Sequence, residues 1–171
     1  MTTLVTTLLE VGLRAVLRQD GLGLAAKISA VAIGSASYDP DQGQSGLREE
    51  FARFPVSGGK VHGPRQLHVA AIADGPSEGW VREVGFVLSD GTFLTVWSDP
   101  SPDKALAYKA PGINLILALD LALSGVPAGS VVVEAIGDLN LSMAAEFTQM
   151  ATALVDLQRL TLQPYLSGAK E

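Results

Sequence analysis

The sequence predicts an α+β fold, built mainly on an antiparallel sheet, from three observations. An apolar helical pattern comes first in the chain, a run of short β-rich segments joined mostly by turns rich in Gly, Pro and Asp follows, and further helical patterns lie at residues 47–54 and 142–163. Strands joined in sequence by short turns favour antiparallel pairing. We therefore expect a sheet with an N-terminal helix and a short second helix, followed by a C-terminal helix whose spacing is compatible with a coiled coil.

The centre of the predicted sheet is a hairpin over residues 80–97. Two runs rich in β-branched and aromatic residues flank Asp90-Gly91. This dipeptide suits a two-residue type I′ turn, because glycine reaches the required positive φ without steric cost. Both faces of the hairpin are largely apolar, whereas a half-buried hairpin carries apolar residues on one face only. We therefore expect this hairpin to be covered on both sides.

The turn also predicts the register of the hairpin. The expected pairs are Leu88 with Phe93, Phe86 with Thr95, Val84 with Trp97 and Arg82 with Asp99 on one face, and Val87 with Leu94 and Gly85 with Val96 on the other. Glu83 falls on the same face as Gly85, where a charged side chain is unusual. We interpret Glu83 as a partner in a buried or interfacial salt bridge rather than a catalytic acid, because nothing nearby completes a mechanism. We expect Gly85 to permit the close approach of a facing group.

The first helix is predicted over residues 7–19. Thr7-Leu-Leu-Glu10 matches a capping box, in which each of the two side chains satisfies a free backbone N–H of the other residue. Asp20-Gly21 is a typical helix stop. The apolar face of this pattern predicts that the helix lies on the sheet.

The remaining elements follow from local patterns. We expect strands at 27–34, 66–73 and 113–123 and a strand at 131–136 that runs back, a turn-rich loop at 35–46, and a short helix at 47–54 that Pro55 ends. The prediction of this short helix is based on Leu47, Phe51 and Phe54, which recur at helical spacing.

The C-terminal helical pattern begins at Ser142, a plausible N-cap. Phe147, Met150, Leu154 and Leu157 then recur at intervals of 3, 4 and 3 residues, the a/d spacing of about two heptads. This helix either packs back on its own domain or self-associates, and we favour self-association through these four residues. Two heptads alone are marginal in water, so the seam would need support from the preceding domain or a partner chain.

Composition narrows the function classes. The chain has 171 residues, 47% of them hydrophobic, no cysteine and a net charge of −6. An acidic chain is poorly suited to displacing counterions from nucleic acid, and the longest apolar run, Ile113 to Leu123, is too short to span a bilayer as a helix. We expect no nucleic-acid or membrane partner, and we divide the chain into a domain over 1–141 and a C-terminal segment over 142–171.

Metal or catalytic chemistry finds little support in the sequence. His62 and His68 lie six residues apart across a Gly-Pro, and no third ligand is suggested nearby. Asp39, Asp41 and Glu50 match positions 1, 3 and 12 of a calcium loop, but the Gly at its sixth position is missing, so we interpret this loop as a solvated turn. We expect no cofactor, no metal and no enzymatic activity.

Five ordered pieces of the sequence match one family pattern. They are Leu9-Glu-Val-Gly12 continuing to Leu17, Val31-Ala-Ile-Gly34, Leu47-Arg-Glu-Glu50, the hairpin from Trp80 to Leu94, and Tyr108-Lys109-Ala110-Pro111. On these pieces the chain resembles the phage tail-collar fibre family, the N-terminal domain of tail fibres in contractile-tailed phages and related particles, over about residues 6–141. The Arg-Glu-x-Gly hairpin is the most specific piece. Ala110 departs from a usual Pro, and residues 60–79 carry insertions.

The resemblance implies a structural virion protein, made in the host cytoplasm, that attaches a tail fibre to the tail or baseplate. Its expected partners are further copies of itself, as a homotrimer, together with baseplate or tail proteins and a separate distal fibre chain. The chain would be either such an adaptor or a fragment of a longer fibre. Arg82, Glu83, Gly85, Asp90 and Gly91 would form its structural hairpin.

The alternative function is a host-surface module that binds carbohydrate. Sugar sites present exposed aromatic rings, and we expect Trp80, Trp97, Phe86 and Phe93 to lie in the core. Tyr38, Tyr108 and Tyr165 are the aromatic residues that we expect to be free, which is thin support for this alternative.

Overall fold

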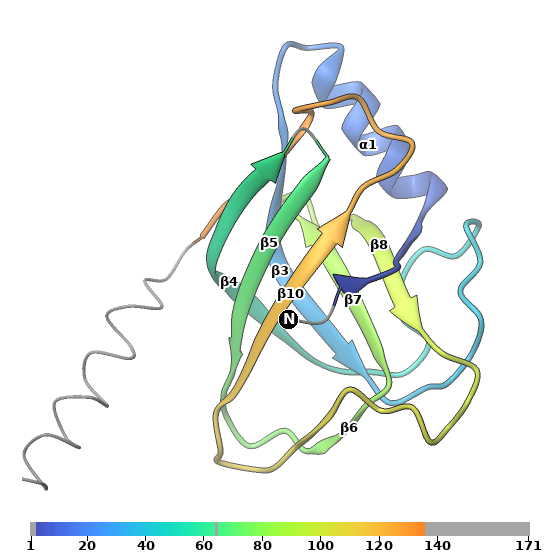
Figure 1. Cartoon of the computed structure of the whole chain (residues 1–171), viewed down its shortest axis with the longest axis vertical. Coiled ribbons are helices and arrows are strands. Elements are labelled where there is room, and N and C mark those ends of the chain that lie inside the picture. Colours follow the sequence, from blue (N-terminus) through green and yellow to red (C-terminus); the bar gives the residue numbers. More distant parts are fainter. Residues whose placement is uncertain (1–2, 64, 136–171) are drawn as a thin grey trace, which may run out of the picture. The chain divides into compact units, whose positions relative to one another are not determined.

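The computed structural model describes residues 3–63 and 65–135, which belong to one compact unit over residues 1–137. These residues form one helix and eleven strands (Figure 1). In chain order the elements are β1 (Thr3–Leu4), β2 (Thr7–Leu8), α1 (Glu10–Asp20), β3 (Ala26–Gly34), β4 (Glu50–Gly63), β5 (Gln66–Ala73), β6 (Gly79–Val81), β7 (Glu83–Leu88), β8 (Phe93–Ser98), β9 (Ala107–Lys109), β10 (Leu115–Ala122) and β11 (Val131–Val133).

Nine of these strands form one curled, largely antiparallel sheet, shaped like a half-barrel. Its order is β1-β10-β5-β4-β3-β7-β8-β2, with β11 pairing in parallel beside the start of β3. The 14-residue strand β4 is the bend of the sheet, because its first half pairs with β3 and its second half with β5. β6 and β9 form a separate two-stranded sheet at the end opposite α1 (Figure 1).

The N-terminal segment lies between the two open edges of the curled sheet. Thr3 and Leu4 pair with β10 at one edge, and Thr7 and Leu8 pair with β8 at the other. The first described residues therefore run from one edge strand, β10, to the other, β8.

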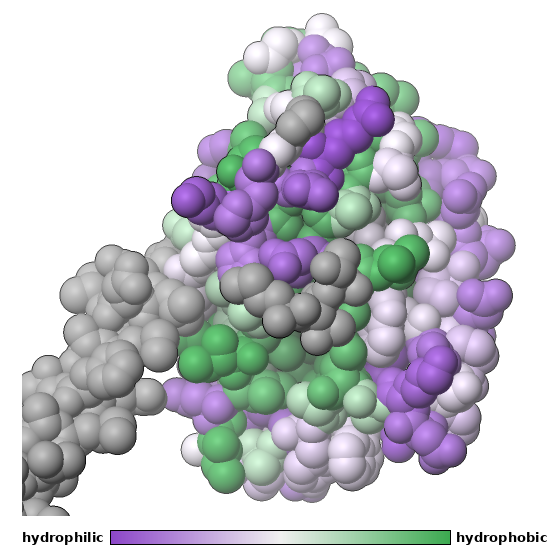
Figure 2. All heavy atoms as spheres, in the orientation of Figure 1, coloured by the Kyte–Doolittle hydropathy of each residue, from purple (hydrophilic) through white to green (hydrophobic). Residues whose placement is uncertain are grey.

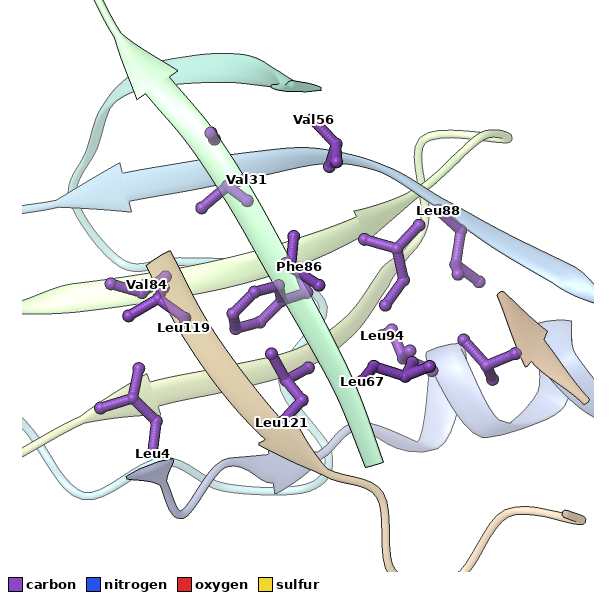
Figure 3. Packing of buried hydrophobic residues seen from close by; sticks show 14 of the residues in the cluster. Leu4, Val31, Val56, Leu67, Val84, Phe86, Leu88, Leu94, Leu119 and Leu121 are labelled. Carbon is purple, nitrogen blue, oxygen red and sulfur yellow. The ribbon is translucent and has the colours of Figure 1, made fainter. Parts of the chain in front are cut away.

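The main core fills the inside of the curled sheet. Phe86 of β7 is fully buried in the middle of it, surrounded in Figure 3 by side chains from β7, β8 and β10. Burying an aromatic side chain of this size contributes roughly 2–3 kcal/mol to folding. A smaller cluster on the outer side of the sheet contains Leu9, Ala32, Val87, Phe93 and Val96. The hairpin β7–β8 is thus covered on both faces, as its sequence predicted.

The turn of this hairpin differs from the prediction. Gly91 N–H donates to Leu88 O at 2.9 Å, and Gly91 has φ of 86°, but Asp90 does not have positive φ. The loop is therefore a three-residue turn with a glycine bulge, which a type I′ turn excludes. The pairs of Val84, Gly85 and Phe86 keep the predicted register.

The bulge exchanges two neighbouring side chains between the faces of the sheet. Phe93 pairs with Val87 and joins the outer cluster, whereas Leu94 joins the main core. The predicted partners of Phe93 and Leu94 are therefore wrong, because the turn shifts the pairing by one residue as far as Val87 and Phe93, and the irregularity between Phe86 and Val87 restores the predicted register beyond them.

The predicted α+β class is wrong for the described residues, which form a mainly antiparallel sheet with a single helix. The predicted helix at 47–54 does not form, and residues from Glu50 onward belong to β4. Phe51 and Phe54 have helical spacing, but pairing with β3 decides their conformation. Pro55 is tolerated inside β4 because the ladder to β5 begins only at Val56, so β4 has one neighbour at that point.

The first helix begins at Glu10, and the predicted capping box does not form. Thr7 lies in β2, and the N-cap residue Leu9 makes no side-chain cap. The first free donors are satisfied instead by the neighbouring chain: Leu9 N–H donates to Leu94 O, and Glu10 N–H donates to Gln42 O. The predicted stop at Asp20 and Gly21 is confirmed.

Three predicted strands are confirmed, as β3, β5 and β10. The segment predicted at 131–136 forms β11, but β11 runs parallel to β3 rather than back along β10. The boundary at residue 141 and the C-terminal helix with Phe147, Met150, Leu154 and Leu157 lie outside the described residues and stay predictions. Within residues 3–63 and 65–135, no helix has the length and apolar character needed to cross a membrane.

One face of the described surface is noticeably apolar. Figure 2 shows hydrophobic atoms gathered over the lower part of β5 and β10, in the orientation of Figure 1. Ile116 of β10 is 47% exposed and pairs with Ile72 of β5, and the next pair on the same face of the two strands is Ala118 with Ala70.

Candidate functional site

Glu83, at the start of β7, holds the long loop between β3 and β4. Its carboxylate is fully buried and accepts three hydrogen bonds, from Tyr38 Oη at 2.9 Å, Arg48 N at 2.9 Å and Glu49 N at 2.7 Å. A buried carboxylate is tolerated when several donors satisfy its oxygens. Its partner across the ladder is Gly34, where any Cβ would overlap the carboxylate.

The salt bridge predicted for Glu83 is wrong. The donors are two backbone N–H groups and a phenol, and Arg48 contributes its backbone rather than its guanidinium. That guanidinium lies over the ring of Tyr38, with Cζ 3.9 Å from the ring centroid. These donors could not be predicted from the sequence, because they lie on a loop 34 to 45 residues away from Glu83 along the chain.

Tyr38 is buried, although the sequence suggested a free aromatic residue. Its ring is 6% exposed and its hydroxyl donates to Glu83 and accepts from Gln44 Nε2 at 3.1 Å. Burial, together with the charge of Glu83, raises the pKa of Tyr38 to about 12. Tyr38 therefore stays a hydrogen-bond donor to Glu83 throughout the neutral range.

Gly85 lies directly beneath the ring of Phe93. A Cβ at this position would be 2.6 Å from Phe93 Cε1, closer than atoms in contact can lie, and 3.2 Å from Leu47 Cδ2, a tight contact. The glycine thus lets the outer cluster close over β7, and Leu47 covers it from the loop. Asp90 and Gly91 form the turn of the same hairpin, where Asp90 Oδ1 accepts from Thr92 N at 2.9 Å.

Trp80 and Tyr108 form an exposed aromatic pair on the small β6–β9 sheet. They are 50% and 46% exposed, lie directly opposite each other in the ladder, and have ring centroids 5.1 Å apart with an angle of 58° between the rings. The sequence placed Trp80 in the core, which is wrong. β6 belongs to the separate small sheet and ends just before β7 begins, so the burial of the β7–β8 hairpin does not extend to Trp80.

Arg82 links this aromatic pair to a shallow pocket. Its guanidinium lies 5.9 Å from the ring centroid of Trp80, and its Nε donates to Pro102 O at 3.0 Å. The predicted pairing of Arg82 with Asp99 does not occur, because the β7–β8 ladder ends at Glu83 and Ser98. The pocket, of about 560 Å³, is lined by Ser35, Ala36, Ser37, Tyr38, Arg48, Glu49, Arg82 and Pro102.

Lys109 is a buried cation that the sequence analysis did not single out. It is fully buried, and its ammonium group donates to Gly75 O at 3.1 Å and Ala110 O at 2.7 Å. These contacts tie β9 to the turn before β6, directly beside Tyr108. Its place in the Tyr-Lys-Ala-Pro piece of the family pattern was the available signal.

The remaining candidate residues do not form a metal site. His62 and His68 are brought together by the β4–β5 hairpin, with ring centroids 6.1 Å apart. His68 Nδ1 lies 2.7 Å from Asp120 Oδ1. Within the described part of the chain, no three or more His, Asp or Glu side chains converge as metal ligands would. Glu50 pairs with Arg53 instead of closing a loop with Asp39 and Asp41.

Comparison with known proteins found no match. No protein-family profile fits the chain, and no curated protein and no solved structure is significantly similar to it. The likeness to the tail-collar fibre family therefore rests on the quoted sequence pieces alone. The site itself consists of two parts, a buried Glu83 network that positions a loop and an exposed surface formed by Trp80, Tyr108, Arg82 and Arg48.

Proposed function

We propose that this chain is a structural attachment protein, which joins a tail fibre to the tail or baseplate of a contractile-tailed phage or a related particle. The observation that carries the proposal is the exposed pair of Trp80 and Tyr108 on the small β6–β9 sheet, with the guanidinium of the half-buried Arg82 beside Trp80. Trp, Tyr and Arg are the residue types that contribute most of the binding energy at protein interfaces. An exposed pair of large rings favours a docking surface.

The most specific piece of the family pattern has a structural role that fits this proposal. Glu83 holds the loop that carries Arg48, Gly85 admits Phe93, and Arg82 lies next to Trp80. These residues of the hairpin thus shape the surface rather than a reaction centre. Glu83 uses its carboxylate on three donors of its own chain, which supports a binding function over acid–base catalysis.

Site-specific photo-crosslinking would test the docking surface directly. The chain would carry benzoylphenylalanine at Tyr108 in the cell that produces the particles, and adducts on purified particles would be identified by mass spectrometry. We expect adducts with a tail or baseplate protein. The matched control carries the same group at Leu22, which is 70% exposed in the turn after α1, at the opposite end of Figure 1 from β6. Absence of the chain from the particles would contradict the proposal.

The proposal includes assembly as a homo-oligomer, with a trimer as the expected state. The seam of Phe147, Met150, Leu154 and Leu157 lies outside the described residues, so its support is the heptad spacing in the sequence. Light scattering at tens of micromolar would test it. We expect a trimer for the native chain and a monomer with an intact sheet after Leu154→Asp with Leu157→Asp. A monodisperse native monomer would contradict self-assembly through this chain.

Carbohydrate binding remains a second candidate, because Trp80 and Tyr108 are exposed rather than buried. Exposed rings present apolar faces to sugar C–H groups as well as to protein side chains. A glycan array with the native chain and Trp80→Ala would distinguish the two functions. Glycan binding that requires Trp80 would favour this candidate over attachment through proteins.

A further inference from the structure

The pocket next to Trp80 presents two arginine side chains on one surface. Arg48 and Arg82 both line it, together with Ser35 and Ser37. Its volume of about 560 Å³ lies within the usual range of small-molecule and side-chain sites. The pocket is shallow, so it suits a group presented by a partner rather than an enclosed ligand.

The guanidinium groups of both arginines are held in place by groups other than carboxylates. The backbone of Arg48 is fixed by Glu83 and its guanidinium lies over Tyr38, while Arg82 is fixed through Nε by Pro102 O. In residues 3–63 and 65–135, the ion pairs involve other cations, so neither guanidinium has an acidic partner there. The terminal N–H groups of Arg48 and Arg82 are therefore available as donors.

A third unpaired group lies at the same place. Ser37 Oγ is buried and has no hydrogen-bond partner among the described residues. Buried hydroxyls are normally paired, and each unpaired one needs an explanation. A bound acceptor in the pocket would supply one.

The acids near the pocket are already engaged. Glu49 Oε2 accepts from Ser35 Oγ at 2.8 Å, and both oxygens of Glu83 accept from the loop. These two charges balance those of the arginines, so long-range attraction of an anion is weak. Recognition would depend on direct hydrogen bonds, and planar guanidinium groups match a carboxylate in two parallel bonds.

We propose that the pocket formed by Arg48, Arg82 and Ser37 receives the carboxylate of an acidic side chain from a protein partner, while Trp80 and Tyr108 contact apolar groups beside it. The rings support a peptide over a sugar. They are tilted by 58° and touch each other, and Arg82 lies over the face of Trp80, so no single flat platform is open for a pyranose ring. This inference rests on the proposed function, because it names the chemistry of the partner at the same surface.

Titration of the full-length chain with acetyl-glutamate amide would test the pocket. The readout is the NMR shift of the Arg48 and Arg82 Nε–H groups and the Trp80 indole N–H. We expect saturable binding in the roughly millimolar range, because one anchor gives little more than about 4 kcal/mol. The isosteric acetyl-glutamine amide should bind about fivefold more weakly or not at all.

Two variants with the same charge change complete the test. Arg48→Gln should weaken acetyl-glutamate binding about fivefold, whereas Arg65→Gln, in the β4–β5 turn, should leave it unchanged. If Arg48→Gln does not fold, the comparison of the two amides on the native chain decides the question. Equal binding of the two amides, or no saturable shift, would overturn the inference. Binding of uncharged methyl glucoside at the same signals would also overturn it, in favour of the carbohydrate.

The failure of this inference and of the proposed function are distinguishable. If crosslinks from position 108 reach a tail or baseplate protein but neither amide binds, the attachment function stands and the acidic anchor is wrong. If acetyl-glutamate amide binds as expected but the chain is absent from particles, the pocket is a carboxylate site and the attachment function is wrong.

Discussion

Trp80 and Glu83 lie three residues apart in the chain but differ in their exposure to solvent. Glu83, a charged residue, is fully buried and completely hydrogen-bonded, whereas Trp80, a large aromatic residue, is half exposed. Hydrophobicity alone would assign them the other way round. The difference arises at Arg82, where the chain leaves the small β6–β9 sheet and enters the main one.

This comparison separates the residues that build the scaffold from those that it presents. At the buried end, a substitution should change the free energy of unfolding and alter the loop that carries Arg48. At the exposed end, a substitution should change binding and leave folding intact. Variants along this short stretch therefore test whether the two roles are distinct.

The largest expected effect belongs to Glu83→Gln. The amide keeps one acceptor oxygen but turns its NH₂ toward a group that also donates, so at least one buried hydrogen bond is lost and the others lose a charged acceptor. We expect the free energy of unfolding to fall by about 3–4 kcal/mol, measured by urea denaturation. Glu49→Gln, at an exposed carboxylate in the same loop, should change it by less than about 0.5 kcal/mol. Equal effects of the two variants would contradict a special role for Glu83.

Gly85→Ala should have the next largest effect. The new methyl group would lie 2.6 Å from Phe93 Cε1, so the ring must move out of the outer cluster. We expect a loss of about 2–3 kcal/mol, typical of overpacking in a core. Adding Phe93→Leu should recover part of this loss, and additive effects in the double variant would show that the two sites do not touch.

Alkaline pH should destabilise the native chain through Tyr38. Its pKa is raised to about 12 in the fold from a usual value of 10.0, so between these values the unfolded state releases a proton that the folded state keeps. Stability is therefore complete below pH 10 and decreases as the pH rises toward 12, by on the order of 2 kcal/mol. Thermal unfolding across this range should show the decrease.

Tyr38→Phe removes the titrating group and should abolish that part of the pH dependence. At neutral pH it also removes one donor to Glu83, with an expected cost of about 1–2 kcal/mol. Tyr108→Phe, at an exposed ring, is the matched control and should keep the native alkaline profile. An unchanged profile in Tyr38→Phe would show that another group causes the alkaline loss.

Local sequence patterns were sufficient for the strands whose neighbours share their chemistry. β3, β5 and β10 were predictable from apolar runs bounded by turns, and the two-sided burial of the central hairpin was predictable from its composition. Elements whose conformation depends on partners far away in the sequence were not predictable from local patterns. Glu50 to Pro55 became part of β4 because β3 pairs with it, and α1 begins at Glu10 because strand and loop carbonyls replace a side-chain cap.

The candidate site was the least predictable part for the same reason. Glu83 was recognisable as an unusual inward acid, but its donors come from a loop far away in the sequence. The exposure of Trp80 depends on β6 pairing with β9, about 28 residues later, which no local periodicity encodes. The three-residue turn after Leu88 similarly placed Phe93 on the outer face and Leu94 in the core, because it shifts the pairing by one residue until the irregularity between Phe86 and Val87 restores the predicted register.

The smallest effect on stability should come from the exposed pair. Trp80→Ala and Tyr108→Ala remove rings that are about half accessible and that the main core does not include. Beyond the loss of their mutual contact, worth about 0.5–1.5 kcal/mol, we expect little change in unfolding. Crosslinking from position 108 to the partner should nevertheless fall sharply in Trp80→Ala, because truncating interface aromatics often costs 2 kcal/mol or more of binding energy. A variant that unfolds like Glu83→Gln would show that Trp80 belongs to the scaffold, and that the boundary at Arg82 does not separate folding from binding.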